Sequence, residues 1–596
     1  MNRSKRTTAF ILCLIMLTAL FAGCAGEDKN AQAPEATGQE DKNPSASDAS
    51  GKEDTPEPVG DGEKETLSMG ANMNFEDLDK DWWPSEFVAF IEDKLHINFE
   101  IVEYDADTLN LALAGGDLPD LLMVNDSQPI LDGKQAVPMD DYLEEYGSNI
   151  KKFTIRNEMI RKYLSNGDGK LYFHTPNTGS EDITGGTEIW NGYLVRWDLY
   201  KEIGTPEVKN DEDYIEVLKK MKELYPATEN GDPVYATGIH NDGGLWGWCM
   251  RAIANKGFSN IGGSWSYVVN TNTNEIYHNF LDTENGPFWD NMEFYNRLFN
   301  EGLLDPDSFT MKAEQVNEKA AKGQYIGGYC TWYTGKLYET EREKDPNTLK
   351  GIVSIPVEGM NGWYGQDALV GWSDKLLFIT NKCKNVPLAV KFIDFFDSDE
   401  ANRAHYSGIQ GEHWDYNAEG IPEVFPETIA LRATGGEEWR KTGIGSFSNF
   451  VGASGFGKHS DGQYYNLFDD PEVKAKTLNP LQKDFSEFYG VEYPAQAHYK
   501  MVQEGKATNQ QNALHQTIMM GVNAVPSDLA RIDSQLEEIV TRAIPSLVQA
   551  KDAAEFSQLQ SKVIADLEKA NAQESWEWWQ KQWNDSKTYV ESILKK

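Results

Sequence analysis

From about residue 65 onward, short apolar segments alternate with amphipathic segments of helical length, and this alternation restricts the possible folds more than any other feature. The opening unit is the clearest: residues 66–73 predict a strand, 83–95 a helix, 98–104 a strand, 107–114 a helix and 121–124 a buried strand. Strands that alternate with helices form sheets covered by those helices. We therefore predict an α/β fold with mainly parallel strand pairing.

The N-terminus carries a secretion signal. Basic residues at positions 3, 5 and 6 precede an apolar run, residues 9–21, which is shorter than the roughly 20 residues of a membrane-spanning helix. Small residues then lead to Cys24, and this pattern resembles a lipobox, where bacterial lipoproteins are cut and diacylated. Phe21 departs from the Leu usual in that motif. We expect residues 1–23 to be a signal peptide and Cys24 to carry lipid; the alternative is an ordinary signal peptide and a chance Cys.

Residues 24–65 predict a flexible tether. They are rich in Ala, Glu, Asp, Lys, Ser, Pro and Gly, and Val59 is their single large aliphatic side chain, so they cannot bury a core. A charged segment of this kind between a lipid anchor and a folded body is typical of a linker across the cell wall. We therefore expect the protein on the extracellular face of the cell membrane, which favours a Gram-positive organism.

Charge and cysteine content narrow the function further. The formal net charge of −40 is spread along the chain without a basic cluster, which excludes nucleic acid as a natural partner. The same charge disfavours polyanionic ligands at long range, although a local Lys or Arg pocket could still hold an acidic sugar. Cys249, Cys330 and Cys383 lie far apart in the sequence, which argues against a disulfide framework or a zinc site and leaves one bridge open.

Five segments carry a family resemblance. The first, "LAGGDLPDLLMVND" (113–126), is a helix end, a Gly- and Pro-containing turn and a buried strand. The others are residues 166–177, 191–224, 294–333 and 376–420. In this order they resemble family 1 extracellular solute-binding proteins of bacterial carbohydrate ABC transporters, in particular the large lipoproteins of the LplA/LipO/YtcQ group. The resemblance covers about residues 66 to 420.

This resemblance implies a type II periplasmic-binding-protein fold, in which two α/β lobes joined by crossing strands close on a ligand, here with additional C-terminal helices. By that analogy lobe 1 comprises residues 66–185 and about 365–430, and lobe 2 about 186–364 and about 431–596. The resemblance also implies a monomer that docks on ABC transporter permease subunits, contacts the membrane through the diacylglyceryl group of Cys24 only, and needs no cofactor.

Catalytic and metal-binding motifs were sought as an alternative. The sequence contains no G-x-S-x-G elbow, no H-E-x-x-H, no Walker A motif and no complete Rossmann fingerprint. Its nine His are scattered, and His413 is expected to be a loop residue. Residues 226–233 lack the alternating Asp and Asn that a calcium loop needs, so no metal is predicted there. We expect no enzyme; the alternative is a secreted polysaccharide-degrading enzyme.

Tryptophan content points to the ligand, because the chain has 17 Trp residues. Sugar rings stack on flat aromatic surfaces, while their hydroxyls need polar partners such as Asp, Asn or Arg. The sequence therefore favours an oligosaccharide, with a peptide or amino acid as the alternative. Arg196 is either a ligand for an acidic sugar or part of a salt bridge at a helix start.

The candidate ligand contacts follow strand ends and loops, where binding clefts form. The resemblance implies a sugar-stacking role for Trp332. The full set is Asn125, Asp126 and Ser127 after the third strand, Trp190 and Asn191 before the "YLVRWD" strand, Trp246 and Trp265 in Gly-rich loops, Trp332, and Trp363, Asp367 and Trp372 at the return crossing. The alternative for each Trp is core packing. For Trp576, Trp579 and Trp583, which recur at helical spacing, core packing is the prediction.

Overall fold

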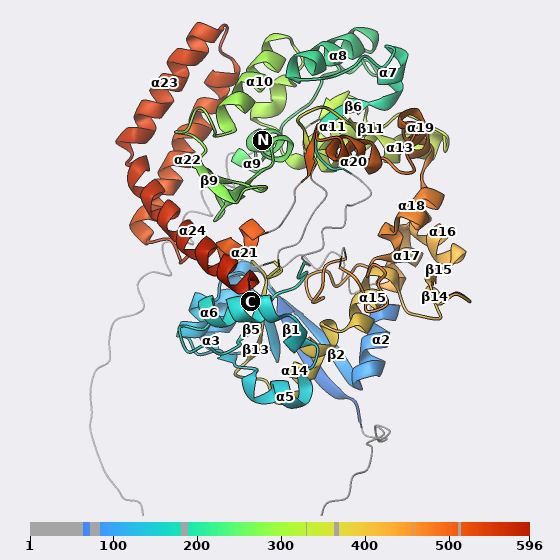
Figure 1. Ribbon diagram of the computed structural model, residues 1–596, viewed down its shortest axis with the longest axis vertical. Coiled ribbons are helices and arrows are strands. Elements are labelled where there is room, and N and C mark those ends of the chain that lie inside the picture. The colour runs from blue at the N-terminus through green and yellow to red at the C-terminus, as the bar shows by residue number, and fades with distance from the viewer. Residues whose placement is uncertain are drawn as a thin grey trace, which may run out of the picture. The chain divides into compact units, whose positions relative to one another are not determined.

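The computed structural model describes residues 63–71, 84–179, 189–328, 330–362, 369–372, 374–455, 457–509 and 514–595, all within one compact unit, Glu63–Lys596 (Figure 1). The predicted signal peptide, Cys24 and nearly all of the predicted tether lie outside the described residues. So do Trp363 and Asp367.

The first part of the unit supplies most of one sheet. Its elements are β1 (Glu65–Ala71), α2 (Glu86–Leu95), β2 (Ile97–Glu103), α3 (Ala106–Gly115), β3 (Leu121–Val124), α4 (Gln128–Asp132), β4 (Ala136–Val137), η3 (Asp140–Tyr142), α5 (Leu143–Tyr146), η4 (Ile150–Lys152), α6 (Thr154–Tyr163) and β5 (Phe173–His174). The five predicted elements are all present; β3 has the predicted bounds, and the ends of the other four are shifted. For example, α2 begins at Glu86 because Ser85, which follows Pro84, caps it by accepting the Val88 N–H at 3.3 Å.

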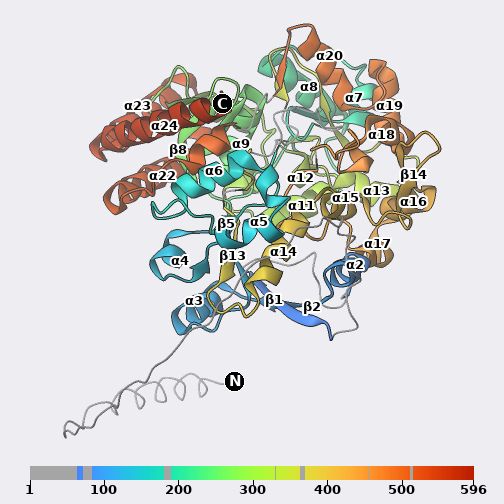
Figure 2. The same ribbon diagram turned by 60° about the horizontal axis from the view of Figure 1, so that its bottom comes forward.

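The first sheet has the strand order β2-β1-β3-β13-β4, and β5 also pairs with β13 (Leu376–Thr380). β1 runs parallel to both β2 and β3, as the alternation predicts. β13 is antiparallel to β3, β4 and β5, so mainly parallel pairing is wrong beyond the opening unit. The reason is that β13 enters the sheet after a long excursion through the second core rather than from an adjacent crossover helix. Figure 2 shows α14 beside these strands.

The middle of the chain builds a second group of elements. These are β6 (Tyr193–Arg196), α7 (Trp197–Glu202), α8 (Asp211–Leu224), α9 (Leu245–Lys256), β7 (Phe258–Ile261), β8 (Ser264–Asn270), β9 (Glu275–His278), α10 (Phe288–Asn300), η5 (Pro306–Phe309), α11 (Ala313–Ala321), β10 (Gly327–Gly328), α12 (Thr331–Thr334), α13 (Leu337–Lys344), β11 (Ile352–Ile355) and β12 (Asn361–Gly362). β6 lies between β10 and β11 in an antiparallel sheet.

After β13 the chain is largely helical. It forms α14 (Val386–Phe396), α15 (Asp399–Ser407), the β14–β15 hairpin (Trp414–Tyr416 and Pro422–Val424), α16 (Pro426–Thr434), α17 (Gly436–Thr442), η6 (Leu467–Asp469), α18 (Pro471–Thr477), α19 (Pro480–Tyr489), α20 (Ala495–Gln503), β16 (Thr508–Asn509), α21 (Leu514–Met520), α22 (Ser527–Val548), α23 (Ala553–Lys569) and α24 (Ala572–Leu594). These last helices match the predicted C-terminal addition.

Two large hydrophobic cores result. The first core packs the first sheet against α2, α6 and α14, and the second core packs α7 to α10, α22 and α23 around β6. β8 contributes to both, because its side chains alternate: Val268 lies in the second core, while Tyr267 and Val269 lie in the first. Two buried cores in an α/β chain agree with the predicted fold class.

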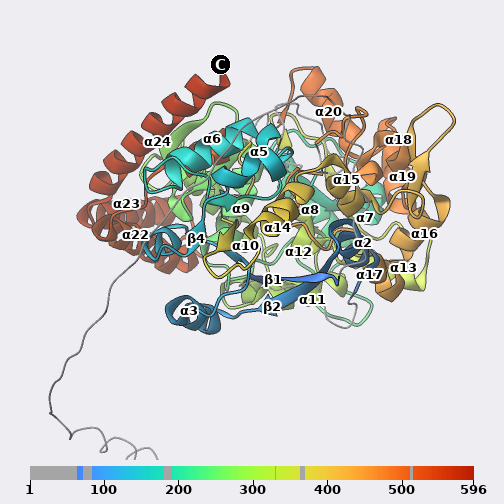
Figure 3. The same cartoon turned by 90° about the horizontal axis from the view of Figure 1, so that it is seen from below.

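Helix α24 connects the two cores. Trp579 and Trp583 are fully buried, as predicted, and their indole N–H groups donate to Asp533 on α22 at 3.0 Å and to the Asn274 carbonyl at 2.9 Å. Trp576 is only half-buried and packs against the edge of the first core. Further along, Tyr589 packs edge-on against Tyr163 of α6, with ring centroids 5.7 Å apart. Figure 3 shows α24 beside α6.

Two further observations concern cysteines and helices. Cys249, Cys330 and Cys383 are all free thiols, which settles the bridge left open above. Burial raises the pKa of the Cys383 thiol to about 12.

Among the helices of the described residues, none combines the length and the apolar composition needed to cross a bilayer.

Candidate ligand-binding site

Trp190 is held next to helix α12. Its carbonyl accepts the Thr331 N–H at 3.0 Å, and the strand that follows it, β6, pairs with β10 just before α12. The Trp190 side chain is half-buried. Trp332 lies on α12, a one-turn helix, and its side chain is outside the described residues. The structure thus brings Trp190 and the backbone of Trp332 together.

Asn191 is buried and hydrogen-bonded within the protein. Its side-chain N–H groups donate to the Asn361 carbonyl at 2.8 Å and to the Asn255 side chain at 3.0 Å. These bonds join the start of β6 to β12 and to α9, because a buried amide has to satisfy its donors internally. The geometry gives Asn191 a positioning role beside Trp190; direct contact with a ligand stays a prediction.

Trp246 belongs to an aromatic cluster with His240 and Tyr333. The ring centroids of His240 and Tyr333 are 4.7 Å apart, those of Trp246 and Tyr333 5.3 Å, and those of His240 and Trp246 5.6 Å. Trp246 and Tyr333 are half-buried and together form a broad apolar surface. Trp246 lies on α9 and not in the expected Gly-rich loop, because that glycine segment is short and only precedes the helix.

Glycines and a carboxylate position this cluster. A Cβ on Gly243 would lie 2.4 Å from the His240 ring, so only glycine allows the α9 start to approach it so closely. His240 pairs with Asp242 at 2.9 Å through Nδ1. Burial raises the pKa of Asp242, but hydrogen bonds from His240 and from the Ala313 N–H outweigh it, so the net pKa is lowered. Asp242 is therefore ionised at neutral pH and fixes the His240 ring.

Trp372 lies where three chain segments run together. Its N–H donates to the Pro176 carbonyl at 2.9 Å, and the neighbouring Asn177 and Thr178 donate their N–H groups to Val451 at 2.8 Å and Gly452 at 2.7 Å. The segments 175–178, 369–372 and 451–454 are thereby linked. The Lys375 ammonium lies 5.7 Å from the centre of the Trp372 ring, which is half-buried.

A buried ion cluster lies under these segments. Arg156 donates to Asp397 through two nitrogens, at 2.9 and 2.5 Å, and His174 Nε2 lies 2.9 Å from the same carboxylate. A Cβ on Gly452 would overlap the Asp397 oxygen, so the 451–454 segment packs directly on the cluster. No sequence pattern indicates this cluster, because Asp397 lies more than 200 positions along the chain from both Arg156 and His174.

The remaining candidates lie apart from Trp190 and Trp246. Asn125 and Asp126 are exposed at the end of β3, as predicted, and Asp126 accepts the Gln128 N–H at 2.9 Å, while Ser127 precedes α4. Trp265 lies on β8 instead of in a loop, and its N–H donates to Glu537 of α22 at 2.5 Å. Among the described contacts, none joins these residues to the aromatic cluster.

A cavity of about 330 Å³ adjoins Trp190. Ile189 and Thr331 line it next to the Trp190 contact, and Lys336, Tyr338, Glu339, Ser354, Asn479 and Gln482 give it a mixed polar wall. Such a mixture of an apolar surface with amide, hydroxyl, ammonium and carboxylate groups suits a polar ligand. Sequence reasoning missed His240, Tyr333 and this wall, because none of them recurs at helical or strand spacing.

Arg196 is engaged within the protein. Its guanidinium donates two hydrogen bonds to Asp198, both at 2.9 Å, and its side chain is 3% exposed. The guanidinium also lies over the Tyr225 ring, 4.3 Å from its centre. Of the two interpretations above, the structure shows the salt bridge at the helix start.

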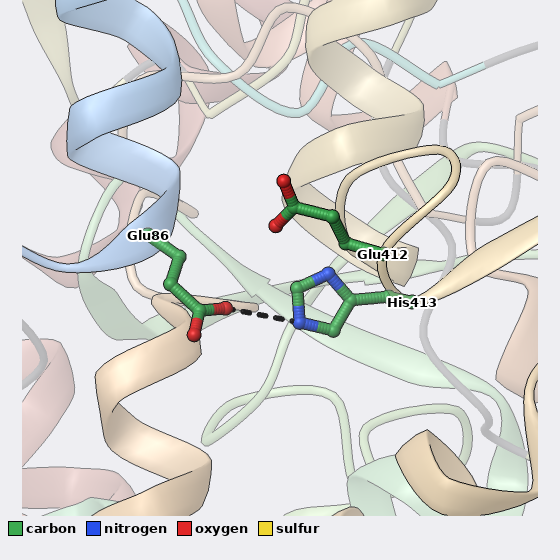
Figure 4. Close-up of side chains that lie close together, drawn as sticks. All are labelled: Glu86, Glu412 and His413. Carbon is green, nitrogen blue, oxygen red and sulfur yellow. Dashed lines mark ion pairs between the residues drawn. The ribbon is translucent and has the colours of Figure 1, made fainter.

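One group of side chains has metal-ligand composition. Among the described residues, Glu86, Glu412 and His413 place one ligand atom each within 4.8 Å of one another (Figure 4). However, His413 Nδ1 accepts the Ile409 N–H at 3.1 Å, which leaves the proton on Nε2, and Nε2 pairs with Glu86 at 3.1 Å. His413 thus ties a loop to α2, as its predicted loop position implies, and offers no free lone pair to a metal.

Three curated proteins resemble the chain. It is 25% identical to "Fructooligosaccharide ABC transporter substrate-binding protein FusA" of Streptococcus pneumoniae serotype 4 over 359 residues, 56% of this chain and 60% of the relative. It is 22% identical to "Lipoprotein LipO" of Bacillus subtilis over 52% of this chain and 59% of the relative. A third, "Polygalacturonan/rhamnogalacturonan-binding protein YtcQ" of Bacillus subtilis, is 22% identical over 69% and 74%. The chain spans about 60% of the length of the first two.

Solved structures of the same kind share the fold. The alginate-binding protein AlgQ2 superposes with a TM-score of 0.52 and 17% identity, covering 87% of this chain and 98% of that one. A human milk oligosaccharide (HMO)-binding, ABC-transporter-associated solute-binding protein of Bifidobacterium longum infantis gives 0.55 and 14%, covering 87% and 99%. No protein-family model matches the chain. The sequence relatives, the structural neighbours and the sequence motifs therefore lead to the same result. The chain is similar to the extracellular solute-binding proteins of carbohydrate ABC transporters, and it has their two-domain α/β fold.

Proposed function

We propose that this chain is the extracellular substrate-binding component of an ABC importer and captures an oligosaccharide between two lobes for delivery to a membrane permease. The observation that carries the proposal is the aromatic surface of Trp246 and Tyr333, close to the contact of Trp190 with α12. Such rings cover the apolar faces of sugars, and the neighbouring amides and hydroxyls suit sugar hydroxyl groups. The relatives, whose printed names include fructooligosaccharide and polygalacturonan binding, support this ligand class.

We place the hinge at the linked segments 175–178, 369–372 and 451–454. On this basis lobe 1 comprises about residues 66–185 and 365–430, extended to about 450 because Phe447 and Phe450 pack in the first core. Lobe 2 comprises the intervening residues and most of the remaining C-terminal part. Rotation about hinge segments closes the lobes on the ligand, and the closed form docks on the permease.

The proposal also assigns a role to the N-terminus and holds that the protein is not an enzyme. Cys24 carries a diacylglyceryl anchor after removal of residues 1–23, and residues 24–65 tether the lobes to the extracellular face of the membrane. The protein acts as a monomer and performs no covalent chemistry. The two alternatives to this function are a polysaccharide-degrading enzyme and a binding protein for peptides or amino acids.

Titration calorimetry against a panel of di- to hexasaccharides, amino acids and short peptides tests the ligand. We expect saturable heat with at least one oligosaccharide, and chromatography of the same mixtures should show the sugar unchanged. Release of shorter products would establish the enzyme instead. Heat with peptides alone would establish the other alternative.

A pair of variants tests the site. Trp246→Ala removes part of the aromatic surface and should weaken sugar binding roughly tenfold or more. Trp439→Ala, on α17 and far from β6 in the sequence, is the control, with affinity close to the unmodified protein. Equal affinities of the two variants would remove Trp246 from the site.

A further inference from the structure

Most cationic side chains around the candidate site are engaged with carboxylates. The exposed Arg342, whose charge acts on the cavity-lining Tyr338, is an exception among the described ion pairs. We consider the described residues 189–196, 245–256, 330–336, 355–362, 369–375 and 505–509, which surround Trp190, the aromatic cluster and Trp372. Within these ranges, each Lys or Arg has a carboxylate partner: Arg196 with Asp198, Arg251 with Asp211, Lys256 with Asp290, Lys336 with Glu339, Lys375 with Asp374 and Lys506 with Glu504.

The two arginines matter most, because a guanidinium is the group that binds a carboxylate or sulfate with two aligned hydrogen bonds. Arg196 and Arg251 are 3% and 5% exposed. Arg251 packs its guanidinium on the Phe294 ring, 3.5 Å from the ring centre, and pairs with Asp211. Both guanidinium groups are buried and each is bonded to a carboxylate, so an anionic ligand that took both nitrogens of either arginine would have to displace Asp198 or Asp211. Arg196 Nη1 makes no hydrogen bond among the described residues, but it is also buried.

The lysines are more exposed, but their carboxylate partners are close by. Lys336 lies 3.5 Å from Glu339, and both line the cavity next to Trp190. Lys375 lies 3.9 Å from Asp374. A ligand carboxylate that approached either ammonium would meet a protein carboxylate of the same charge a few ångströms away, and repulsion would offset the attraction.

The adjoining sequence adds negative charge. Residues 180–188 and 363–368, which connect in the sequence to the considered ranges, contain Glu181, Asp182, Glu188 and Asp367 and no Lys or Arg. With a net charge of −40 for the whole chain, the long-range potential also opposes an anionic ligand.

We infer that the oligosaccharide is uncharged: it carries neither uronate carboxylates nor sulfates, and is built from neutral hexose or pentose units. This inference rests on the proposed function and narrows it. The cavity wall offers sugar hydroxyl groups the Tyr338 hydroxyl and the Ser354 hydroxyl, which makes no hydrogen bond among the described residues, and no ligand charge has to be desolvated.

A matched pair of sugars tests the inference on the full-length protein. The pair is an α-1,4-linked tetragalacturonate and its carboxyl-reduced form, which has the same linkage and no charge. Alongside it, calorimetry covers neutral oligosaccharides of fructose, glucose, xylose, mannose and galactose, and oligomers of mannuronate and guluronate. We expect binding by one or more neutral sugars and none by the uronates at millimolar concentration.

Salt and a variant give independent measurements. Between about 20 and about 300 mM salt, the affinity for the bound neutral sugar should change less than about twofold, because no charge pair forms. Lys256→Gln, at a lysine that pairs with Asp290 and does not line the cavity, should likewise leave the affinity within about twofold. A uronate oligomer that binds more tightly than its reduced counterpart would overturn the inference while the proposed function stands. If no sugar of either class binds, the proposed function fails, and the inference with it.

Discussion

Asn191 was selected as a ligand contact from its place before β6, and its structural contacts lead to a stability prediction. Replacing it by Ala removes the donors for the buried Asn361 carbonyl and the Asn255 side chain. We expect Asn191→Ala to lower the free energy of unfolding by about 1–3 kcal/mol, because two buried groups each lose a hydrogen-bond donor. Urea unfolding of the variant and the unmodified protein measures this loss of stability.

Asn125 provides the matched control, since it is exposed at the end of β3. Asn125→Ala should stay within about 0.5 kcal/mol of the unmodified protein. If the two variants are equally stable, the hydrogen bonds of Asn191 do not hold β6 to β12.

Asp397 combines burial with hydrogen bonds from Arg156 and His174. Burial alone would raise its pKa, but Arg156 and His174 outweigh that effect and hold the pKa at about 2. A carboxyl whose folded pKa is depressed stabilises the fold above its ordinary pKa, and that stability is lost as the pH falls towards about 2. We expect Asp397→Asn to cost about 3–5 kcal/mol at neutral pH, because Arg156 keeps its buried charge without a counter-ion.

The double variant Arg156→Met/Asp397→Leu tests the cause. It removes both charges, so unfolding measurements should show it more stable than Asp397→Asn. A double variant that is less stable than the single one would show that the charges themselves hold the segments 175–178 and 451–454.

At the scale of elements, local patterns predicted what is local. The strand 121–124 was predicted with the bounds that β3 has, because an unbroken apolar run after a Gly-Pro turn has few other solutions. Trp246 and Trp265 were assigned to loops and lie on α9 and β8, because short glycine pairs only precede these elements. The aromatic cluster brings together residues from three separate segments, and such contacts leave no periodic trace in one sequence.

The turn between β7 and β8 shows how closely α24 packs on the three-stranded sheet β7-β8-β9. Gly262 and Gly263 both have positive φ, of 62° and 73°, so a side chain strains either position. The two positions differ in how much room a side chain would have: a Cβ on Gly262 would lie 2.1 Å from the Trp579 ring, whereas a Cβ on Gly263 would have no neighbour within 4 Å. We expect Gly262→Ala to be about 1–3 kcal/mol less stable than Gly263→Ala in thermal or urea unfolding.

Equal stabilities of these two variants would mean that the C-terminal helix is not fixed against β8 in solution. The comparison is specific, since the backbone strain is common to both variants and cancels in their difference.

At the scale of the whole molecule, α24 and β8 each contribute side chains to both cores. Asp533 accepts from Tyr267 at 2.8 Å, Ser575 at 2.6 Å and Trp579 at 3.0 Å, which anchors the first half of α24 firmly. Its second half meets α6 through the half-buried Tyr589, whose hydroxyl donates to Glu158 at 3.1 Å. We expect the buried contacts of Asp533 to persist during the proposed lobe motion, and the contact of the half-buried Tyr589 with α6 to adjust.

Buried histidines make stability depend on pH across the whole molecule. Burial lowers the pKa of His278 to about 4 and of His405 to about 3, and it also lowers the pKa of His174 and His498. All four remain neutral in the folded state, while the unfolded chain protonates them below about pH 6.5. Their stabilising contribution is present above pH 6.5 and is lost as the pH falls towards 4, by up to about 1.4 kcal/mol per pH unit for each residue.

His405 isolates this contribution from the acidic groups, which titrate in an overlapping range. Both of its ring nitrogens are buried without a hydrogen-bond partner among the described residues, and Phe87 packs beside it with ring centroids 6.0 Å apart. His405→Leu should therefore be tolerated at pH 7. Because leucine cannot be protonated in the unfolded chain, the variant should lose less stability than the unmodified protein on acidification, by about 1.4 kcal/mol per pH unit below pH 6.5. Urea unfolding at several pH values measures the difference, and parallel curves for the two proteins would show that His405 is accessible to protons in the folded state.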